Sequence, residues 1–233
     1  LLETLPNLSL LDPACGSGSF LIVAYERILR WYRDWLASKI PEWTNKQGRV
    51  APPKPYDEWV AFSNLEGGRR DLRLRPKLKK QVLLDNIFGV DIDEQAVEVT
   101  CFSLSMKALE DLDHTNIHAD ASLFNMRILP DFRANVKCGN SLIDTDVSGR
   151  FEERDIEFTR ADRTATNAFN WNRSFPSVME SKRPGFDVVI GNPPYDVVEK
   201  ERGKASWPHW VLTEYVKSDT GAYNSALGGK TNL

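Results

Sequence analysis

The sequence predicts an α/β fold built on a doubly wound sheet, and three features of the chain lead to this prediction. An apolar strand at residues 9–11 runs into a glycine turn and then a helix. A second apolar stretch, residues 86–90, ends at the acid Asp91. A third, residues 186–190, enters an Asn-Pro-Pro-Tyr turn. Strands that alternate with helical segments are typical of βαβ units.

The first strand leads into the loop Asp12-Pro13-Ala14-Cys15-Gly16-Ser17-Gly18. Gly16 and Gly18 allow the backbone to approach a ligand closely, and the following helix points its free N–H groups and positive dipole end at that ligand. An anionic or zwitterionic cofactor fits there. The dinucleotide pattern G-x-G-x-x-G is absent, because Leu21 stands at its third glycine position. S-adenosylmethionine is therefore expected rather than a nicotinamide.

The second strand ends in Asp91, and an acid at a strand end is suited to bind two ribose hydroxyls. Ile92, the next residue, is placed to lie against an adenine ring. Asp93 precedes a helical pattern and is expected to be an N-cap rather than a ligand. The apolar positions of that pattern are Val97, Cys101, Leu104 and Ala108.

The third strand enters the turn Asn192-Pro193-Pro194-Tyr195. Two consecutive prolines fix their own φ and favour extended geometry in the residue before each, which holds the carbonyls of Asn192 and Pro193 rigid. The Asn192 side-chain oxygen and the Pro193 carbonyl are suited to accept the two hydrogens of an exocyclic amine. The Tyr195 ring offers a face for a flat heterocycle. The turn indicates a methyltransferase that acts on nitrogen.

Together these segments resemble the gamma-class N6-adenine-specific DNA methyltransferases (NPPY type) of fused type II or phage-defence restriction-modification systems. The loop from Asp12 to Phe20 is similar to the family's cofactor loop, Asp91-Ile92 to its ribose and adenine contact, and Gly139-Asn140-Ser141-Leu142 to its third cofactor segment. Many members of that family have Asp where Asn140 stands, and Asn can both donate and accept.

The resemblance implies a partial, Rossmann-like, class I S-adenosylmethionine-dependent methyltransferase core with helical and polar insertions. The catalytic residues it implies are Asn192, Pro193, Pro194 and Tyr195. The cofactor-binding residues it implies are Asp12, Pro13, Ala14, Cys15, Gly16, Gly18, Asp91, Ile92, Asn140, Ser141 and Leu142. No metal or covalent nucleophile is required.

The expected reaction takes an adenine flipped out of duplex DNA, stacks it on Tyr195 and presents its N6 to Asn192 and Pro193. Three alternatives stay open. N4 of cytosine presents the same two hydrogens. Methyltransferases with the same turn also act on RNA or on a glutamine side chain of a protein. A catalytically silent scaffold or specificity partner is the alternative outside catalysis.

Residues 1–233 are expected to form one catalytic core, with an insertion at 31–80 between the first two strands and a polar insertion at 145–184 before the last. A target recognition domain is expected to be absent from this chain, and nuclease or specificity domains, fused or separate, are expected outside it. Helical spacing predicts a helix over 19–39 that Pro41 ends. Alternation over 151–158 predicts a small hairpin.

The charge balance predicts that any affinity for DNA is local, because the formal net charge is -3. The one basic cluster, residues 69–80, carries the hypothesis of a contact to the DNA backbone beside the cofactor loop, although a solvated surface is the favoured interpretation.

The compartment expected for this chain is the cytoplasm of a bacterium or archaeon. No apolar run is long enough for a membrane span, the first residues lack a signal-peptide pattern, and the three cysteines are widely spaced. Two weaker patterns are set aside. Gly228–Thr231 lacks the spacing of a phosphate-binding loop, and His114 with His118 lacks a third strong metal ligand.

Overall fold

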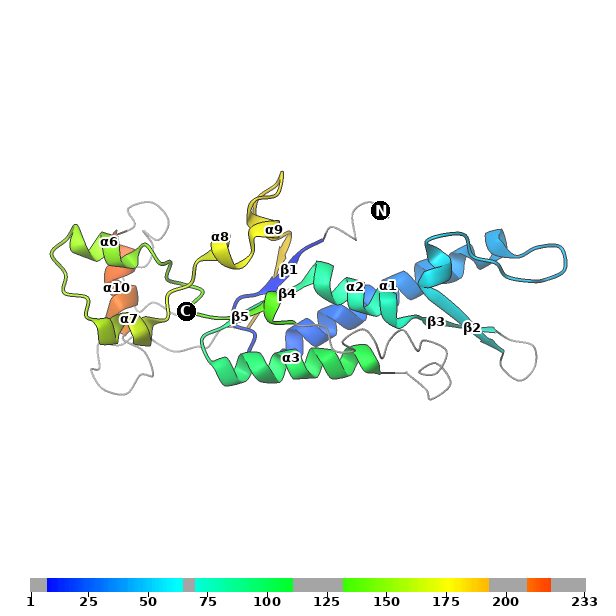
Figure 1. The fold of residues 1–233 in the computed structure, drawn as a ribbon, viewed down its shortest axis with the longest axis horizontal. Helices are drawn as coiled ribbons and strands as arrows, with labels where there is room; N and C mark the ends of the chain where they lie inside the picture. Colours follow the sequence, from blue (N-terminus) through cyan, green and yellow to red (C-terminus); the bar gives the residue numbers. More distant parts are fainter. Residues whose placement is uncertain (1–7, 65–69, 111–131, 193–208, 219–233) are drawn as a thin grey trace.

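The computed structural model describes residues 8–64, 70–110, 132–192 and 209–218. It confirms the α/β prediction. Four parallel strands form one sheet in the order β5-β4-β1-β6 (Figure 1). The strands are β1 (Leu10–Asp12), β4 (Ile87–Asp91), β5 (Val136–Cys138) and β6 (Val188–Val189).

The strand order reverses direction between β1 and β6. From β1 the chain moves outward to β4 and then β5, and it returns to place β6 on the opposite side of β1. In open parallel sheets, ligands bind beyond the carboxyl ends of the strands at such a reversal. The topology therefore points to the carboxyl ends of β1 and β6.

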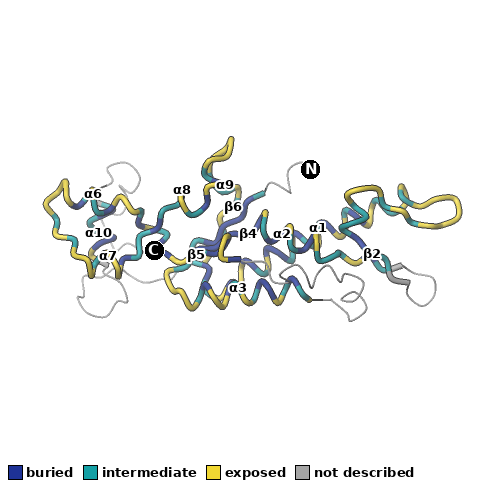
Figure 2. Tube along the Cα trace, in the orientation of Figure 1, coloured by how far each residue is buried: buried dark blue, intermediate teal, exposed yellow. Residues whose placement is uncertain are grey.

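Helices cover both faces of the sheet, and alternate strand residues point to each. Leu10, Ile87 and Val136 face one layer, whereas Leu11, Phe88 and Val90 face the other. Figure 2 shows the buried strands between the two layers. The first layer consists of α1 (Ser19–Trp43), α2 (Pro76–Asn86) and α3 (Glu94–Leu109). The second contains Phe169, Phe175 and Val178 from around α8 (Trp171–Ser174) and α9 (Pro176–Met179).

Helix α1 extends well beyond the sheet. The prediction that Pro41 ends this helix is wrong: α1 continues to Trp43, and the N–H of Thr44 donates to the Pro41 carbonyl. Pro41 lies in the last turn, so the hydrogen bond that it cannot donate to the turn before it is one of the last in the helix. Beyond it come η2 (Tyr56–Glu58) and an antiparallel hairpin of β2 (Val60–Asn64) and β3 (Arg70–Leu74), at the far end of α1 from its glycine turn (Figure 1).

A small helical lobe lies near the carboxyl edge of the sheet (Figure 1). It consists of α6 (Val147–Glu152), α7 (Arg160–Thr166) and α10 (His209–Ser218). The hairpin predicted over 151–158 is wrong. Val147 and Phe151 are four residues apart, so they share one side of α6 and bury themselves against Leu212. The 3₁₀ turn η3 (Phe132–Ala134) precedes β5.

Within the described ranges, none of the helices combines the length and apolar character needed to cross a membrane.

Candidate active site at the carboxyl edge of the sheet

The residues singled out in the sequence come from four strand ends that meet at one edge of the sheet. Asp12 ends β1 and Asp91 ends β4. Asn140 follows β5, and Asn192 follows β6. Because all four strands are parallel, their carboxyl ends lie at the same edge. The rest of the turn, residues 193–195, lies outside the described residues.

The glycine loop adopts the left-handed backbone that its sequence suggests. Gly16 has φ of 53° and Gly18 has φ of 82°, where a side chain is strained. A Cβ on Gly16 would meet nothing within 4 Å, so this position opens onto free space. A Cβ on Gly18 would lie 2.8 Å from Cγ2 of Thr100. Gly18 is also the N-cap of α1, which begins directly behind the loop.

Three hydrogen bonds hold the loop against the neighbouring strand and helix. The N–H of Cys15 donates to the Val90 carbonyl at 3.0 Å, and the N–H of Gly16 donates to Oδ2 of Asp91 at 2.7 Å. Oγ1 of Thr100 donates to the Gly16 carbonyl at 2.7 Å. Thr100 is fully buried. Sequence reasoning missed this residue, and its one signal was a hydroxyl within the buried stripe of a predicted helix.

The two acids after β4 have different roles. Asp93 is the N-cap of α3, because its Oδ1 accepts from the N–H of Gln95 at 2.9 Å, and this confirms the prediction. Asp91 accepts from Gly16 through Oδ2 and from the N–H of Asp93 through Oδ1 at 3.0 Å. Each carboxylate oxygen of Asp91 keeps a further lone pair for a ligand. Ile92, between them, is 40% exposed at this edge.

Asn140 is buried with an unused donor. Its backbone N–H donates to the Asn167 carbonyl at 2.7 Å, and its Oδ1 accepts from the N–H of Leu142 at 3.1 Å. Its side-chain nitrogen, Nδ2, is buried and has no hydrogen-bond partner. A buried unpaired donor costs about 1–3 kcal/mol, and a bound acceptor would remove that cost. Ser141 follows it, and Leu142 is exposed.

The strand that carries the Asn-Pro-Pro-Tyr turn is fixed in register against β1. Val188 lies opposite Leu10, and the N–H of Ile190 donates to the Leu11 carbonyl at 2.9 Å. At the other end of the pair, Oδ2 of Asp187 accepts from both N–H and Oγ of Ser9 at 2.8 and 2.9 Å. These contacts join residues 178 positions apart.

Gly191 brings the turn directly beside the glycine loop. A Cβ on Gly191 would lie 2.8 Å from Oδ1 of Asp12 and 3.5 Å from Cδ of Pro13. Asn192 follows at an exposed position. The requirement for glycine at 191 is a second feature that sequence reasoning missed, because it depends on which strand is the neighbour.

The electrostatics of the loop favour neutral groups. Burial raises the pKa of the Asp12 carboxyl, the hydrogen bond from the Ala14 N–H at 3.1 Å lowers it, and the charge of Asp91 raises it further. Burial, followed by the charges of Asp91 and Asp12, raises the pKa of the Cys15 thiol to about 12. A thiol of this kind stays protonated and is a poor nucleophile.

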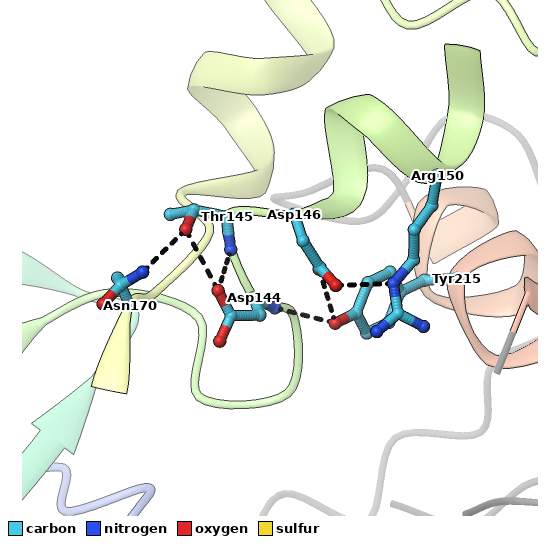
Figure 3. A network of polar contacts seen from close by, with 6 residues as sticks. All are labelled: Asp144, Thr145, Asp146, Arg150, Asn170 and Tyr215. Carbon is cyan, nitrogen blue, oxygen red and sulfur yellow. Dashed lines mark hydrogen bonds and ion pairs between the residues drawn. The ribbon is translucent and has the colours of Figure 1, made fainter. Parts of the chain in front are cut away.

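Helix α10, which follows the turn in the sequence, is anchored to the segment at the start of α6 (Figure 3). On α10, the Tyr215 hydroxyl donates to Oδ1 of Asp146 at 2.9 Å and accepts from the N–H of Asp144 at 3.3 Å. Oδ2 of Asp146 pairs with Arg150 at 2.6 Å. On the other side, Nδ2 of Asn170 donates to Oγ1 of Thr145 at 3.0 Å. Segments on either side of β6 in the sequence are thus joined.

No group of three or more His, Cys, Asp or Glu in the described ranges could hold a metal ion. His114, His118 and Gly228–Thr231 lie outside those ranges.

A parallel sheet with its polar groups at a strand-order reversal defines an α/β domain of the ligand-binding class. Residues 85–230 match the family described as Eco57I restriction-modification methylase. This is more than half of the chain, and the chain belongs to that family, a family of DNA methyltransferases of restriction-modification systems.

Two curated proteins are similar to this chain. The type II restriction enzyme and methyltransferase RM.Eco57I of Escherichia coli is 27% identical over 193 residues, which cover 83% of this chain and 15% of that protein. The putative type II restriction enzyme and methyltransferase RM.MjaORFECS2P of Methanocaldococcus jannaschii is 30% identical over 142 residues, which cover 61% of this chain and 9% of that protein. The chain thus spans a small part of the relatives' length. No solved structure matches it.

Proposed function

We propose that this chain is the catalytic part of an enzyme that transfers a methyl group from S-adenosylmethionine to N6 of an adenine flipped out of DNA. The observation that carries the proposal is the contact between Gly191 and Asp12, 2.8 Å from a Cβ built on Gly191 to Oδ1. This contact puts the start of the Asn-Pro-Pro-Tyr turn beside the glycine loop, at the reversal in strand order. Donor and acceptor sites must lie this close for direct transfer.

The residues present fit S-adenosylmethionine. The open space at Gly16 admits a ligand against the loop backbone. Asp91 has lone pairs left for ribose hydroxyls, and the unused Nδ2 of Asn140 is suited to donate to a ring nitrogen of adenine. The exposed side chains of Ile92 and Leu142 offer apolar surface for the flat ring. Once bound, the cofactor supplies an electrophilic methyl group on a sulfonium centre.

The protein's own contribution is positioning and hydrogen bonding. The Asn192 side-chain oxygen and the Pro193 carbonyl would each accept one hydrogen of the target amine. These bonds favour a more electron-rich nitrogen as the new bond forms. Tyr195 would stack on the extruded base. The described part of the site offers no activated nucleophile, since the Cys15 thiol is held protonated. We therefore propose direct transfer without a covalent enzyme intermediate.

The donor half of the proposal is tested by calorimetric titration of S-adenosylmethionine into the full-length protein that carries this chain. Asp91→Ala removes the proposed ribose contact and a bond to Gly16, and we expect binding at least about 10-fold weaker. Asp93→Ala is the matched control, because Asp93 caps α3 two residues away. We expect it to bind within about 3-fold of the parent. Equal affinities for the two variants would contradict the proposed site.

The acceptor half is tested by methyl transfer to unmethylated DNA. N6-methyladenine is the expected product. N4-methylcytosine would change the target base, and transfer only to RNA or protein would change the class of substrate. Binding of the cofactor without any transfer would point to a silent scaffold.

A further inference from the structure

Charge is distributed very unevenly along this chain. Residues 27–80, here called the basic arm, contain 14 Lys and Arg but 6 Asp and Glu, a net charge of +8. The whole chain has a net charge of -3, so the remaining residues sum to -11. The basic arm includes most of α1 and the β2-β3 hairpin. A basic region on an otherwise acidic protein is the electrostatic signature of a polyanion-binding surface.

In the structure, the exposed positive charges do not lie where the basic tract of the sequence suggested. The hypothesis for the tract 69–80 placed its contact with DNA beside the cofactor loop, and that placement is wrong. The hairpin and α2 lie away from that loop (Figure 1). Much of the tract is also engaged: Nε of Arg75 donates to the Val60 carbonyl, Lys77 pairs with Glu58, and Lys79 is buried with Nζ on the Glu110 carbonyl.

The available charges lie instead on the outer side of α1. Arg27, Arg30 and Arg33 are exposed and recur every three residues, so they follow one side of the helix. Arg33 reaches Asp71 on β3 at 3.4 Å, and Arg73 reaches the same carboxylate at 3.5 Å. The row of arginines therefore continues from α1 onto the hairpin.

The end of the basic arm adds further positive charge. The loop after α1 contains the exposed Lys46, Arg49 and Lys54, with no acid between residues 43 and 56. Asp34, exposed on α1, and Asp71 are acids beside the arginine row, and a third acid, Glu26, is paired with Lys107.

A chain of aromatic rings packs the segments of the basic arm together. Trp31 and Trp35 stack at 6.3 Å, and Trp43 stacks on Tyr56 at 5.4 Å. Tyr56 and Trp59 then carry the contacts back to Trp35 and Tyr32. Leu36, Val60 and Leu72 join this cluster to the core under the sheet. The basic arm is thus a packed extension of the core that also supports the candidate active site.

The length of α1 suits duplex DNA. Helix α1 begins at the glycine loop and has 25 residues. At 1.5 Å per residue this is about 37 Å, close to the ~34 Å of one turn of B-DNA. A duplex lying along α1 would return its phosphates to the same side after one turn. Guanidinium groups match phosphate oxygens in two-point hydrogen bonds.

We propose that the basic arm binds the phosphate backbone of duplex DNA within about one helical turn of the base presented to the turn at Asn192. The choice of DNA rests on the proposed function, whereas phosphate binding by the basic arm does not require methyl transfer. Binding through phosphates is independent of sequence. The basic arm thus adds affinity and orientation, and the recognition of a particular site is left to other parts of the protein.

The test compares two triple variants of the full-length protein. Arg27→Gln/Arg30→Gln/Arg49→Gln removes three exposed arginines of the basic arm. Arg160→Gln/Lys182→Gln/Arg183→Gln removes three exposed charges outside the basic arm. The probe is a labelled duplex of about three turns of mixed sequence, and its dissociation constant is measured between about 50 and 200 mM KCl.

We expect the variant of the basic arm to reduce the slope of log K against log[salt] by roughly 2–3, since each phosphate contact contributes about 0.9. Its affinity at the lowest salt should fall about 10-fold or more. The matched control should keep the parental slope. Calorimetric binding of S-adenosylmethionine should be unchanged in both variants, which would show that both are folded.

An unchanged slope in the variant of the basic arm, or an equal loss in the control, would overturn the proposal. The outcome is separate from that of the proposed function. The salt slope can fall on substitution of the basic arm even if the protein transfers no methyl group. It can equally stay unchanged in a protein that is an active methyltransferase.

Discussion

The candidate active site and the basic arm are built in opposite ways. The site combines residues from four strand ends, and the contact between Ser9 and Asp187 joins positions 178 residues apart. The basic arm is made of neighbouring segments, with rings from Trp31 to Trp59 packed against one another. The site therefore depends on the topology of the sheet, whereas the basic arm depends on local packing.

The two regions also differ in charge. At the site, buried Asp12 lies close to Asp91, and its pKa is raised. In the basic arm, the exposed arginines outnumber the acidic residues beside them. The binding of a polyanion can be spread over many weak contacts, whereas methyl transfer needs a few groups in fixed positions. Substitutions at the site should therefore have large, specific effects, and single substitutions in the basic arm should have small, additive ones.

The largest effect is expected from Asn192→Ala. Loss of the proposed acceptor should reduce the rate of methyl transfer about 10²–10³-fold, by analogy with removal of one transition-state hydrogen bond. Arg30→Gln, in the basic arm, should leave the rate at saturating DNA unchanged. Single-turnover methylation by the full-length protein measures both, and a parental rate for Asn192→Ala would refute the catalytic assignment.

Gly191→Ala should come next. The new methyl group would overlap Oδ1 of Asp12, which is buried and holds the Ala14 N–H, so neither side can move freely. We expect cofactor binding about 10-fold weaker or worse. Gly149→Ala is the control, because a Cβ at Gly149 meets nothing within 4 Å. It should be neutral or stabilise α6 by about 0.5–1 kcal/mol. Equal behaviour of the two variants would argue against close contact between loop and turn.

A third pair compares the two regions directly. Gly18, in the site, and Gly48, in the basic arm, both have positive φ, of 82° and 74°. Alanine at either position should cost roughly 1–2 kcal/mol of unfolding free energy from backbone strain. Gly18→Ala should cost a further 1–3 kcal/mol or so, because its Cβ would meet Thr100 whereas that of Gly48 meets nothing. Urea denaturation measures both, and a larger loss at Gly48 would contradict the packing described for the loop.

The smallest effect is expected from Asp12→Asn, and it depends on pH. The pKa of Asp12 is higher in the folded than in the unfolded chain, so its contribution to stability is fully present at low pH and is lost as pH rises through the folded pKa. Asn keeps the acceptor for Ala14. The variant should therefore be at least as stable as the parent at pH ~7, and its advantage should disappear in acid. Denaturation curves from about pH 4 to 8 that show the opposite trend would contradict the raised pKa.

Sequence reasoning was most successful where the signal is local. The glycine loop, the N-cap at Asp93 and the apolar strands follow from short patterns. The small lobe was not predicted, because Phe151 is buried by α10, which lies about 60 residues later. Thr100 and Gly191 were missed for the same reason, since each acts on a loop that only the folded sheet brings near.

The central claim is that the edge where β1 meets β6 transfers a methyl group to adenine. The most direct measurement incubates the full-length protein with S-adenosylmethionine labelled in its methyl group and unmethylated duplex DNA, then digests the DNA to nucleosides and identifies the labelled one. We predict label on N6-methyladenine, and its loss with Asn192→Ala. Label on cytosine would contradict the assigned base, and no label on DNA would contradict the claim itself.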